Sequence, residues 1–348
     1  MTSVRTPVIG GLQQAALPRR AVAGLAAAVV AVTALLFSVT DLQGTAGFVV
    51  VATLLHLAAQ TVLSRVVEGP RRAADRLVTT AVVAAFLLAL APLVSVLLYT
   101  LQNGLERFDW DFFYRSLRSI GARDAGGGAN HAIVGTLQQV GLATLMSVPL
   151  GLLVAVYVVE YGRGRLAATI RFFVDVMTGI PSIVAGLFVL SFWILGLGFG
   201  YSGFAAALAL TVLMLPVIVR SAEEMLKLVP NDLREASLAL GVPRWKTVVR
   251  IVLPTALPGI VTGVMLAVAR VMGETAPVLL TAFGAASIVR TPFDGPQSSL
   301  PLFIYQEAAS PQQTAIDRAW TAALTLILVI MVLNLLARLI TRRSKIGR

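Results

Sequence analysis

Eight long apolar runs divide this chain of 348 residues and constrain it to a fold that lies in a membrane. A helix of about 20 apolar residues crosses the hydrocarbon core of a bilayer, which is roughly 30 Å thick. The runs are at residues 21–40, 45–64, 77–100, 132–159, 167–195, 203–219, 257–283 and 319–340. Charged residues make up 13% of the chain, whereas soluble domains carry roughly 25%. We therefore predict an all-α polytopic membrane protein with about eight transmembrane helices.

The basic residues predict which ends of these helices face the cytoplasm. The formal net charge is +11, and most Lys and Arg residues fall in alternate gaps between the apolar runs. These gaps are the residues before 21 and the stretches 65–76, 163–165, 220–250 and 341–348. Because basic loops stay on the cytoplasmic side, we expect both termini and the 220–250 stretch there, in a cell membrane, with lipid around the helices. The membrane explains the positive charge better than a nucleic-acid partner does.

The sequence lacks the patterns of several kinds of catalytic site. It has no cysteine, which excludes disulfides, thiolate metal ligands and cysteine nucleophiles. His56 and His131 are its two histidines, and neither belongs to an H-E-x-x-H pattern. No G-x-x-x-x-G-K-[ST] loop is present, so any ATP hydrolysis is expected on another polypeptide. We predict no enzymatic activity, no metal site and no cofactor in this chain.

Two pairs of opposite charges lie within the apolar runs, and one of them is deep. Arg171 and Asp175 are four residues apart in the fifth run, and Arg270 and Glu274 are four apart in the seventh. A spacing of four places both members on one face of a continuous helix, where each partly neutralises the other. Arg270 lies about 20 Å into the hydrocarbon core, whereas Arg171 is close enough to an end to reach the interface.

Two interpretations of the deep pair remain open. In the structural one, Arg270 and Glu274 form an ion pair that fixes packing against a partner subunit. In the functional one, Arg270 lines a translocation path and offers its planar donors to an oxyanion, while Glu274 holds the guanidinium in place. Pro277 removes a backbone donor and is expected to bend or break the helix near Gly273. A bend beside a buried charge favours a cavity.

A polar, basic stretch at residues 220–255 carries a spaced pattern. It reads Glu235-Ala236-Ser237, three residues, Gly241, nine residues, and IVLP at 251–254. Gly241 permits a left-handed helix end and Pro243 favours a new helix start, so we predict two short helices hinged at Gly241. The spacing resembles the cytoplasmic coupling loop of permease subunits in ATP-binding-cassette importers, where this loop binds the ATPase. Ser237 departs from the family's usual alanine, although it is also small.

A closer resemblance rests on three further stretches. They are RVMGETAPVLLTA at 270–282, GIPSIVAGLF at 179–188 and LPLFIY at 300–305. These stretches are similar to those of the PstA-type permeases of phosphate importers, and the resemblance covers about residues 77–345. It implies a six-helix type I permease core at 77–345, with the coupling loop at 220–255 inside it. Residues 1–76 are then an N-terminal extension of two transmembrane helices, to which we assign no chemistry.

The resemblance also implies site residues and partners. Arg270, Glu274 and Thr275 would line the substrate path, and helix bends would fall at Gly179, Pro181, Gly273 and Pro277. The chain would form half of a phosphate path with a PstC-type permease. A PstB-type ATPase dimer would hydrolyse ATP with magnesium, and a PstS-type protein would deliver phosphate.

The alternatives are a permease of the same class for molybdate, sulfate or phosphonate, and a stand-alone secondary transporter. A secondary transporter is expected to repeat a pair of interrupted helices in its two halves, and this sequence shows no such repeat.

One further expectation concerns the glycine-rich stretch at 125–129, which predicts a flexible joint before the fourth run.

Overall fold

The computed structural model describes residues 17–40 and 44–346, which form helices joined by turns and loops. The helices are α1 (Arg19–Val39), α2 (Thr45–Val67), α3 (Pro70–Gly104), α4 (Trp110–Tyr114), α5 (Asn130–Val156), α6 (Arg165–Thr178), α7 (Ser182–Val189), α8 (Gly203–Lys227), α9 (Asn231–Ala239), α10 (Arg244–Thr247), α11 (Leu253–Val271), α12 (Ala276–Ala282), α13 (Leu300–Ala308) and α14 (Gln313–Ile346). The π-helical turns are η1 (Tyr157–Tyr161) after α5, η2 (Leu190–Gly196) after α7 and η3 (Val248–Val252) before α11. These residues contain no β-strand, and a single isolated bridge joins Phe283 and Gln297. The predicted all-α class is confirmed.

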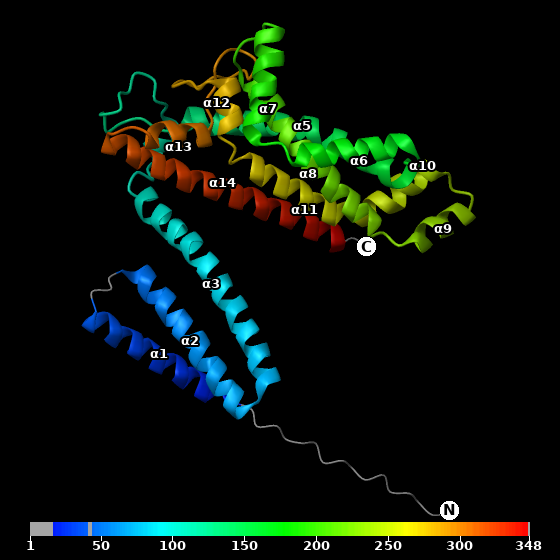
Figure 1. Cartoon of the computed structure of the whole chain (residues 1–348). Helices are drawn as coiled ribbons and strands as arrows, with labels where there is room; N and C mark the ends of the chain where they lie inside the picture. Colours follow the sequence, from blue (N-terminus) through cyan, green and yellow to red (C-terminus); the bar gives the residue numbers. More distant parts are fainter. Residues whose placement is uncertain (1–16, 41–43, 347–348) are drawn as a thin grey trace, which may run out of the picture. The chain divides into compact units, whose positions relative to one another are not determined.

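The chain divides into two compact units, residues 1–98 and 99–348, with the division inside α3. Unit one contains α1, α2 and the first part of α3 (blue to cyan in Figure 1). Phe37 of α1 and Phe48 of α2 meet edge to face, with ring centroids 5.4 Å apart. Thr80 of α3 donates a hydrogen bond to Gln60 of α2 at 3.2 Å, which satisfies two polar groups inside an apolar bundle.

Helix α8 is the centre of unit two, and glycines let its neighbours approach closely. It has buried residues along almost its whole length. A Cβ added at Gly263 of α11 would lie 2.4 Å from Cβ of Ser221, and one at Gly151 of α5 would lie 2.7 Å from Cγ2 of Ile218. Small residues bring helix backbones together in membranes, where packing rather than water drives association. The main core consists of Val140, Ala143, Ala206, Leu210, Met214, Ile218, Ala267, Val268, Val271, Met272, Val278, Ala282 and Leu302.

Within the described residues, seven helices are long and apolar enough to cross a membrane, and the number rises to eight if α6 and the α7–η2 segment form one broken span. This agrees with the prediction of about eight. Two predicted runs are not single straight helices, however. The fifth run is bent by 106° between Thr178 and Ser182, and the seventh contains a break between α11 and α12. The sixth run is longer than predicted, because α8 continues through charged residues to Lys227.

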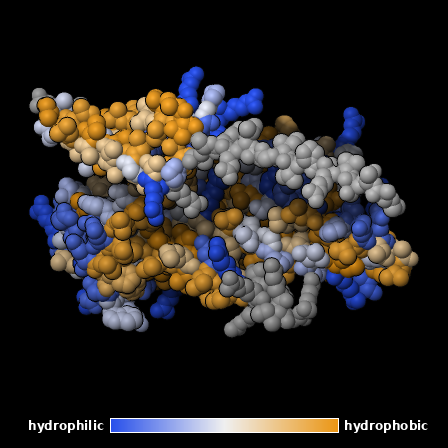
Figure 2. Space-filling model, turned by 90° about the horizontal axis from the view of Figure 1, so that it is seen from below, coloured by the Kyte–Doolittle hydropathy of each residue, from blue (hydrophilic) through white to orange (hydrophobic). Residues whose placement is uncertain are grey.

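Large apolar side chains are exposed along the spans, as a helix in contact with lipid requires. Leu35 of α1 and Leu145 of α5 expose 66% and 70% of their surface. Hydrophobic residues also make up much of the face seen in Figure 2, with hydrophilic residues in separate patches. Soluble monomers rarely expose apolar surface on this scale. The chain is therefore a multi-pass membrane protein.

Candidate functional site

The apolar run that carries Arg270 is interrupted just after this residue. Helix α11 ends at Val271 and α12 begins at Ala276. In the break, Gly273 N–H donates to the carbonyl of Arg270 at 3.2 Å and Glu274 N–H donates to that of Val271 at 3.1 Å. Pro277 occupies the first turn of α12, where a backbone N–H would have no intrahelical partner. Pro277 therefore begins a new helix instead of bending a continuous one.

The expected ion pair between Arg270 and Glu274 is wrong for this chain: no ion pair joins these two residues in the described structure. The physical reason is that the helix ends between them, so the four-residue spacing no longer places them on one face. Arg270 is exposed in the last turn of α11, where the unpaired carbonyls favour a positive charge. Glu274 and Thr275 are half-buried beside it in the chain.

The two broken runs pack against each other. A Cβ added at Gly186 of α7 would lie 2.7 Å from Cα of Pro277 and 3.2 Å from Cδ1 of Leu280 in α12. Gly179 and Pro181 lie between α6 and α7, in the break with the 106° bend. Proline lacks a backbone donor and disfavours the helical conformation of the residue before it. The stretches 179–188 and 270–282 are therefore in direct contact.

The second expected pair, Arg171 with Asp175, is also wrong. Asp175 pairs with Arg220 of α8, and Arg171 Nε lies 3.4 Å from Oε1 of Glu223. The Glu223 carboxylate, 2% exposed, also lies 2.9 Å from Nζ of Lys227. Because α6 runs beside α8, Arg171 and Asp175 each pair with a residue of α8 instead of with each other. Sequence reasoning missed Glu223, since residues 220–227 looked like part of a loop.

The coupling stretch forms two short helices, α9 and α10, joined by a tight turn. Gly241 has φ +76°, and no heavy atom lies within 4 Å of the Cβ it would carry. Gly241 N–H donates to the carbonyl of Leu238 at 2.9 Å, and Val242 N–H donates to that of Ser237 at 3.2 Å. This is the Schellman arrangement, which requires a left-handed residue at its turn. Glycine is needed here for its backbone conformation and not for space.

Within this stretch, Ser237 of the predicted pattern is buried, whereas Glu235 and Ala236 are exposed. The Oγ of Ser237 lies 2.8 Å from Oγ1 of Thr247, so a hydroxyl pair joins α9 to α10. Sequence reasoning missed Thr247, because nothing in a spacing of ten residues predicts that the turn brings the two hydroxyls together. The exposed side also carries Leu240 and Trp245, which are 83% and 62% exposed.

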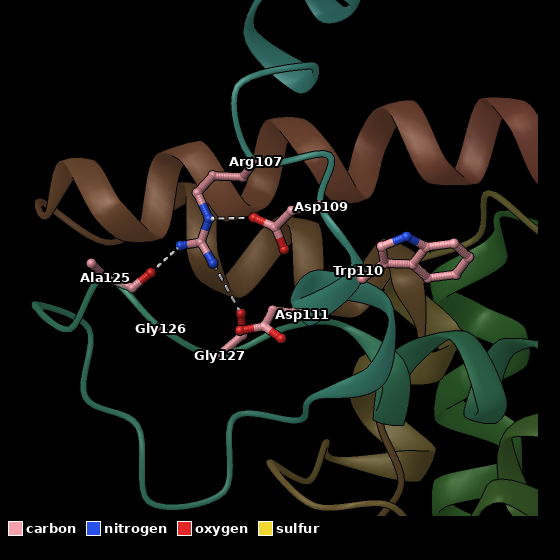
Figure 3. Close-up of a pocket in the computed structure, with 7 residues that line it drawn as sticks. All are labelled: Arg107, Asp109, Trp110, Asp111, Ala125, Gly126 and Gly127. Atoms are coloured by element: carbon pink, nitrogen blue, oxygen red, sulfur yellow. Dashed lines mark hydrogen bonds and ion pairs between the residues drawn. The ribbon is translucent and has the colours of Figure 1, made fainter.

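A hollow of about 430 Å³ lies at the segment before α5, lined by Arg107, Asp109, Trp110, Asp111, Ala125, Gly126 and Gly127. Figure 3 shows the Arg107 guanidinium directed at Asp109 and at the carbonyls of Ala125 and Gly127. Arg318, 1% exposed, holds the same segment through the carbonyls of Asp124 and Gly126. The expected flexible joint is therefore wrong, because two arginines fix this backbone. Their donors are already occupied, which argues against an anion site here.

Comparisons with known proteins place these features in a family. The model of the family described as binding-protein-dependent transport system inner membrane component matches residues 147–346. The chain is 51% identical over 283 residues to phosphate transport system permease protein PstA 1 of Mycobacterium tuberculosis (strain ATCC 25618 / H37Rv), covering 79% of this chain and 91% of the relative. It is 38% identical over 272 residues to PstA of Pasteurella multocida (strain Pm70), covering 77% and 95%. A bacterial alginate ABC transporter of known structure superposes with a TM-score of 0.57 at 16% identity, covering 77% of this chain and 95% of that one, a likeness of fold alone.

Proposed function

Because this chain belongs to the PstA-type permeases, within the family of binding-protein-dependent transport system inner membrane components, we propose that it is a permease subunit of an ATP-driven phosphate importer. It is a transport subunit that works with other components of an ABC importer. The observation that carries phosphate as the substrate is the 51% identity to a phosphate permease over 91% of that relative's length. Neither a permease for another solute nor a stand-alone secondary transporter is favoured by these relatives.

The break between α11 and α12 supports a role in moving an anion. Arg270 is exposed and belongs to none of the ion pairs of the described residues. Its planar fork of donors suits phosphate oxygens. Glu274 and Thr275 follow it closely in the chain and are half-buried. The Glu274 carboxylate repels the anion and so prevents excessive affinity, whereas the Thr275 hydroxyl can donate a hydrogen bond to a phosphate oxygen. Half of the path is made by this chain and half by a PstC-type permease.

The coupling stretch supports a separate ATPase. Glu235 and Ala236 are exposed on α9, and Leu240 and Trp245 add apolar surface beside them. We place a PstB-type ATPase dimer on this surface, where it hydrolyses ATP with magnesium. This surface, both termini and the turn at Gly241 are cytoplasmic, and a PstS-type protein delivers phosphate on the opposite side.

Uptake of radiolabelled phosphate tests the proposal. Cells that lack their own phosphate permease would express this chain with its PstC-, PstB- and PstS-type partners. We expect uptake that requires ATP hydrolysis and that unlabelled molybdate, sulfate or phosphonate does not inhibit. Uptake that persists with an inactive ATPase would indicate a secondary transporter, and inhibition by one of the other anions would indicate a different substrate.

A further inference from the structure

One arginine of the coupling stretch points inward and binds three elements of unit two. Arg234 directly precedes the exposed Glu235, but its own side chain is only 16% exposed. Its Nε and Nη2 donate to Oε1 of Glu160 at 3.0 and 2.8 Å. Nη2 also donates to the carbonyl of Leu226 at 2.8 Å, and Nη1 donates to the carbonyl of Val229. All three nitrogens of the guanidinium are therefore in use.

Two partners of Arg234 lie at the ends of α5 and α8, the pair of helices with the most extensive packing in unit two. Glu160 lies in η1, the π-helical end of α5, and its side chain is 11% exposed. Leu226 lies in the last turn of α8 and is fully buried. Farther along the same two helices, Gly151 of α5 packs directly on Ile218 of α8. One guanidinium thus joins α9 to an α5–α8 pair that already packs as a unit.

The chemistry of this link makes it stiff. A guanidinium that donates two bonds to one carboxylate has a defined orientation, and burial strengthens charge-assisted bonds. Two π-helical turns lie next to the contacts of α9. Glu160 belongs to η1. Thr247, which pairs with Ser237 of α9, is the last residue of α10 and directly precedes η3. Such turns depart from the regular α-helix and are often found at functional sites. Contacts therefore connect α9 to α5 and α8 through Arg234, and to α10 and η3, which precede α11, through the Ser237–Thr247 pair.

We propose that Arg234 and Glu160 are positioning residues that convert a displacement of α9 into a joint movement of α5 and α8. The proposal rests on the proposed function, because an ATPase on the exposed side of α9 supplies the displacement. Neighbouring residues of a helix point about 100° apart, so Glu235 faces the partner while Arg234 faces the membrane helices. Part of the coupling between ATP hydrolysis and transport then passes through this ion pair.

The test compares Arg234→Gln, Glu160→Gln and the double variant in the complete importer, reconstituted in lipid vesicles. Phosphate uptake and ATP hydrolysis are measured in the same vesicles. Arg163→Gln is the matched control, because Arg163 is an exposed arginine three residues from Glu160 with no ion pair among the described residues. We expect the phosphate moved per ATP to fall about fivefold in both single variants, with ATP hydrolysis retained. The phosphate moved per ATP should be no lower in the double variant than in the single variants, since each change removes the same link.

An unchanged ratio in the assembled single variants would overturn the proposal. If neutral variants fail to assemble, Arg234→Lys keeps the charge; we expect a lowered ratio there too, because an ammonium cannot reach Glu160 and both carbonyls at once. If Arg234→Lys moved as much phosphate per ATP as the wild type, the proposed role of the Arg234 guanidinium would be refuted.

Hydrogen exchange of the purified chain separates this inference from the phosphate proposal, since it needs no transport. In Glu160→Gln, amide exchange should rise in both 157–161 and 231–239. A rise in exchange confined to 157–161 would overturn the proposed link between Arg234 and Glu160, whatever the wild-type complex transports. Absence of phosphate uptake by the wild-type complex would instead contradict only the proposal that phosphate is the substrate.

Discussion

Arg270 is an exposed cation at the end of a membrane helix, and its own chain provides no carboxylate partner in the described structure. A buried ion pair would make single substitutions ambiguous, because each would leave a partner charge uncompensated. That ambiguity does not apply here. Loss of the Arg270 charge therefore reports on a ligand or on a partner chain.

We predict that Arg270→Gln lowers phosphate uptake about tenfold or more, because hydrogen bonds to charged groups contribute about 1.5 to 3 kcal/mol. The importer should still assemble. Uptake of labelled phosphate and co-purification of the ATPase measure the two effects separately. Arg338→Gln, at an exposed arginine of α14, is the control and should transport normally. Normal uptake by assembled Arg270→Gln would exclude the role given to this residue.

Glu68 is a second informative residue, in unit one. Its carboxylate accepts hydrogen bonds from the Ser64 hydroxyl at 2.7 Å and the Leu17 N–H at 2.6 Å and pairs with Arg76 at 2.6 Å. The Ser64 hydroxyl most of all, then the Leu17 N–H and Arg76, lower the pKa of Glu68 below its ordinary value of 4.5. Because the folded pKa is the lower one, Glu68 stabilises the fold above pH 4.5, and this stabilisation is lost as the pH falls through the folded pKa.

We therefore expect Glu68→Gln to lower the melting temperature of the purified full chain at pH 7. The difference between variant and wild type should shrink on acidification below about pH 4.5. Glu106→Gln, at an exposed glutamate outside the described ion pairs, should follow the wild-type curve. A constant difference between Glu68→Gln and wild type down to pH 3 would contradict the assignment.

Among the elements, the turn between α9 and α10 depends on backbone conformation alone. Gly241 has positive φ and open space around its missing Cβ. Gly241→Val should cost about 1 to 2 kcal/mol locally, tilt α10 relative to α9, and reduce both ATPase co-purification and uptake. Gly241→Asn is the control, since asparagine tolerates the left-handed conformation. Equal behaviour of the two variants would show that the turn does not depend on positive φ.

The contact between α7 and α12 depends on space instead. A Cβ at Gly186 would lie 2.7 Å from a backbone atom of Pro277, which moves only if α12 moves. We expect Gly186→Ala to lower the free energy of unfolding by about 1 to 3 kcal/mol, measured by denaturant unfolding in detergent, and to reduce uptake. In α5, no heavy atom lies within 4 Å of a Cβ added at Gly141, so the Gly141→Ala control should lower neither the free energy of unfolding nor uptake. An unaffected Gly186→Ala variant would show that the two broken spans do not need this close approach.

At the scale of the whole molecule, the distribution of charge predicts its orientation in the membrane. The chain contains no cysteine, so each introduced thiol is the sole target. In the chain expressed without its ATPase, we expect Ala239→Cys, exposed on α9, to react with an impermeant thiol reagent only in inverted vesicles. Ser287→Cys, exposed between α12 and α13, should react in intact cells. Labelling of both from the same side would reverse or disprove the proposed topology.

The sequence by itself was enough to determine the features that depend on local physics. Apolar runs of membrane length predicted the all-α fold, because each helix satisfies its own backbone groups. Pro181 lies in the break between α6 and α7, and Pro277 lies in the first turn of α12, where a backbone N–H has no intrahelical partner to lose. The left-handed turn at Gly241 likewise follows from glycine and the proline after it.

Only the tertiary structure decided which charges meet. Arg171 and Asp175 share a helix, yet each pairs with α8, and Arg270 and Glu274 are separated by a helix end. Arg234 binds Glu160, 74 residues away in the chain. A fixed spacing predicts neighbours only while one helix continues. Ion pairs are selected by the helices that pack alongside, and helix packing depends on contacts between residues that are remote in sequence.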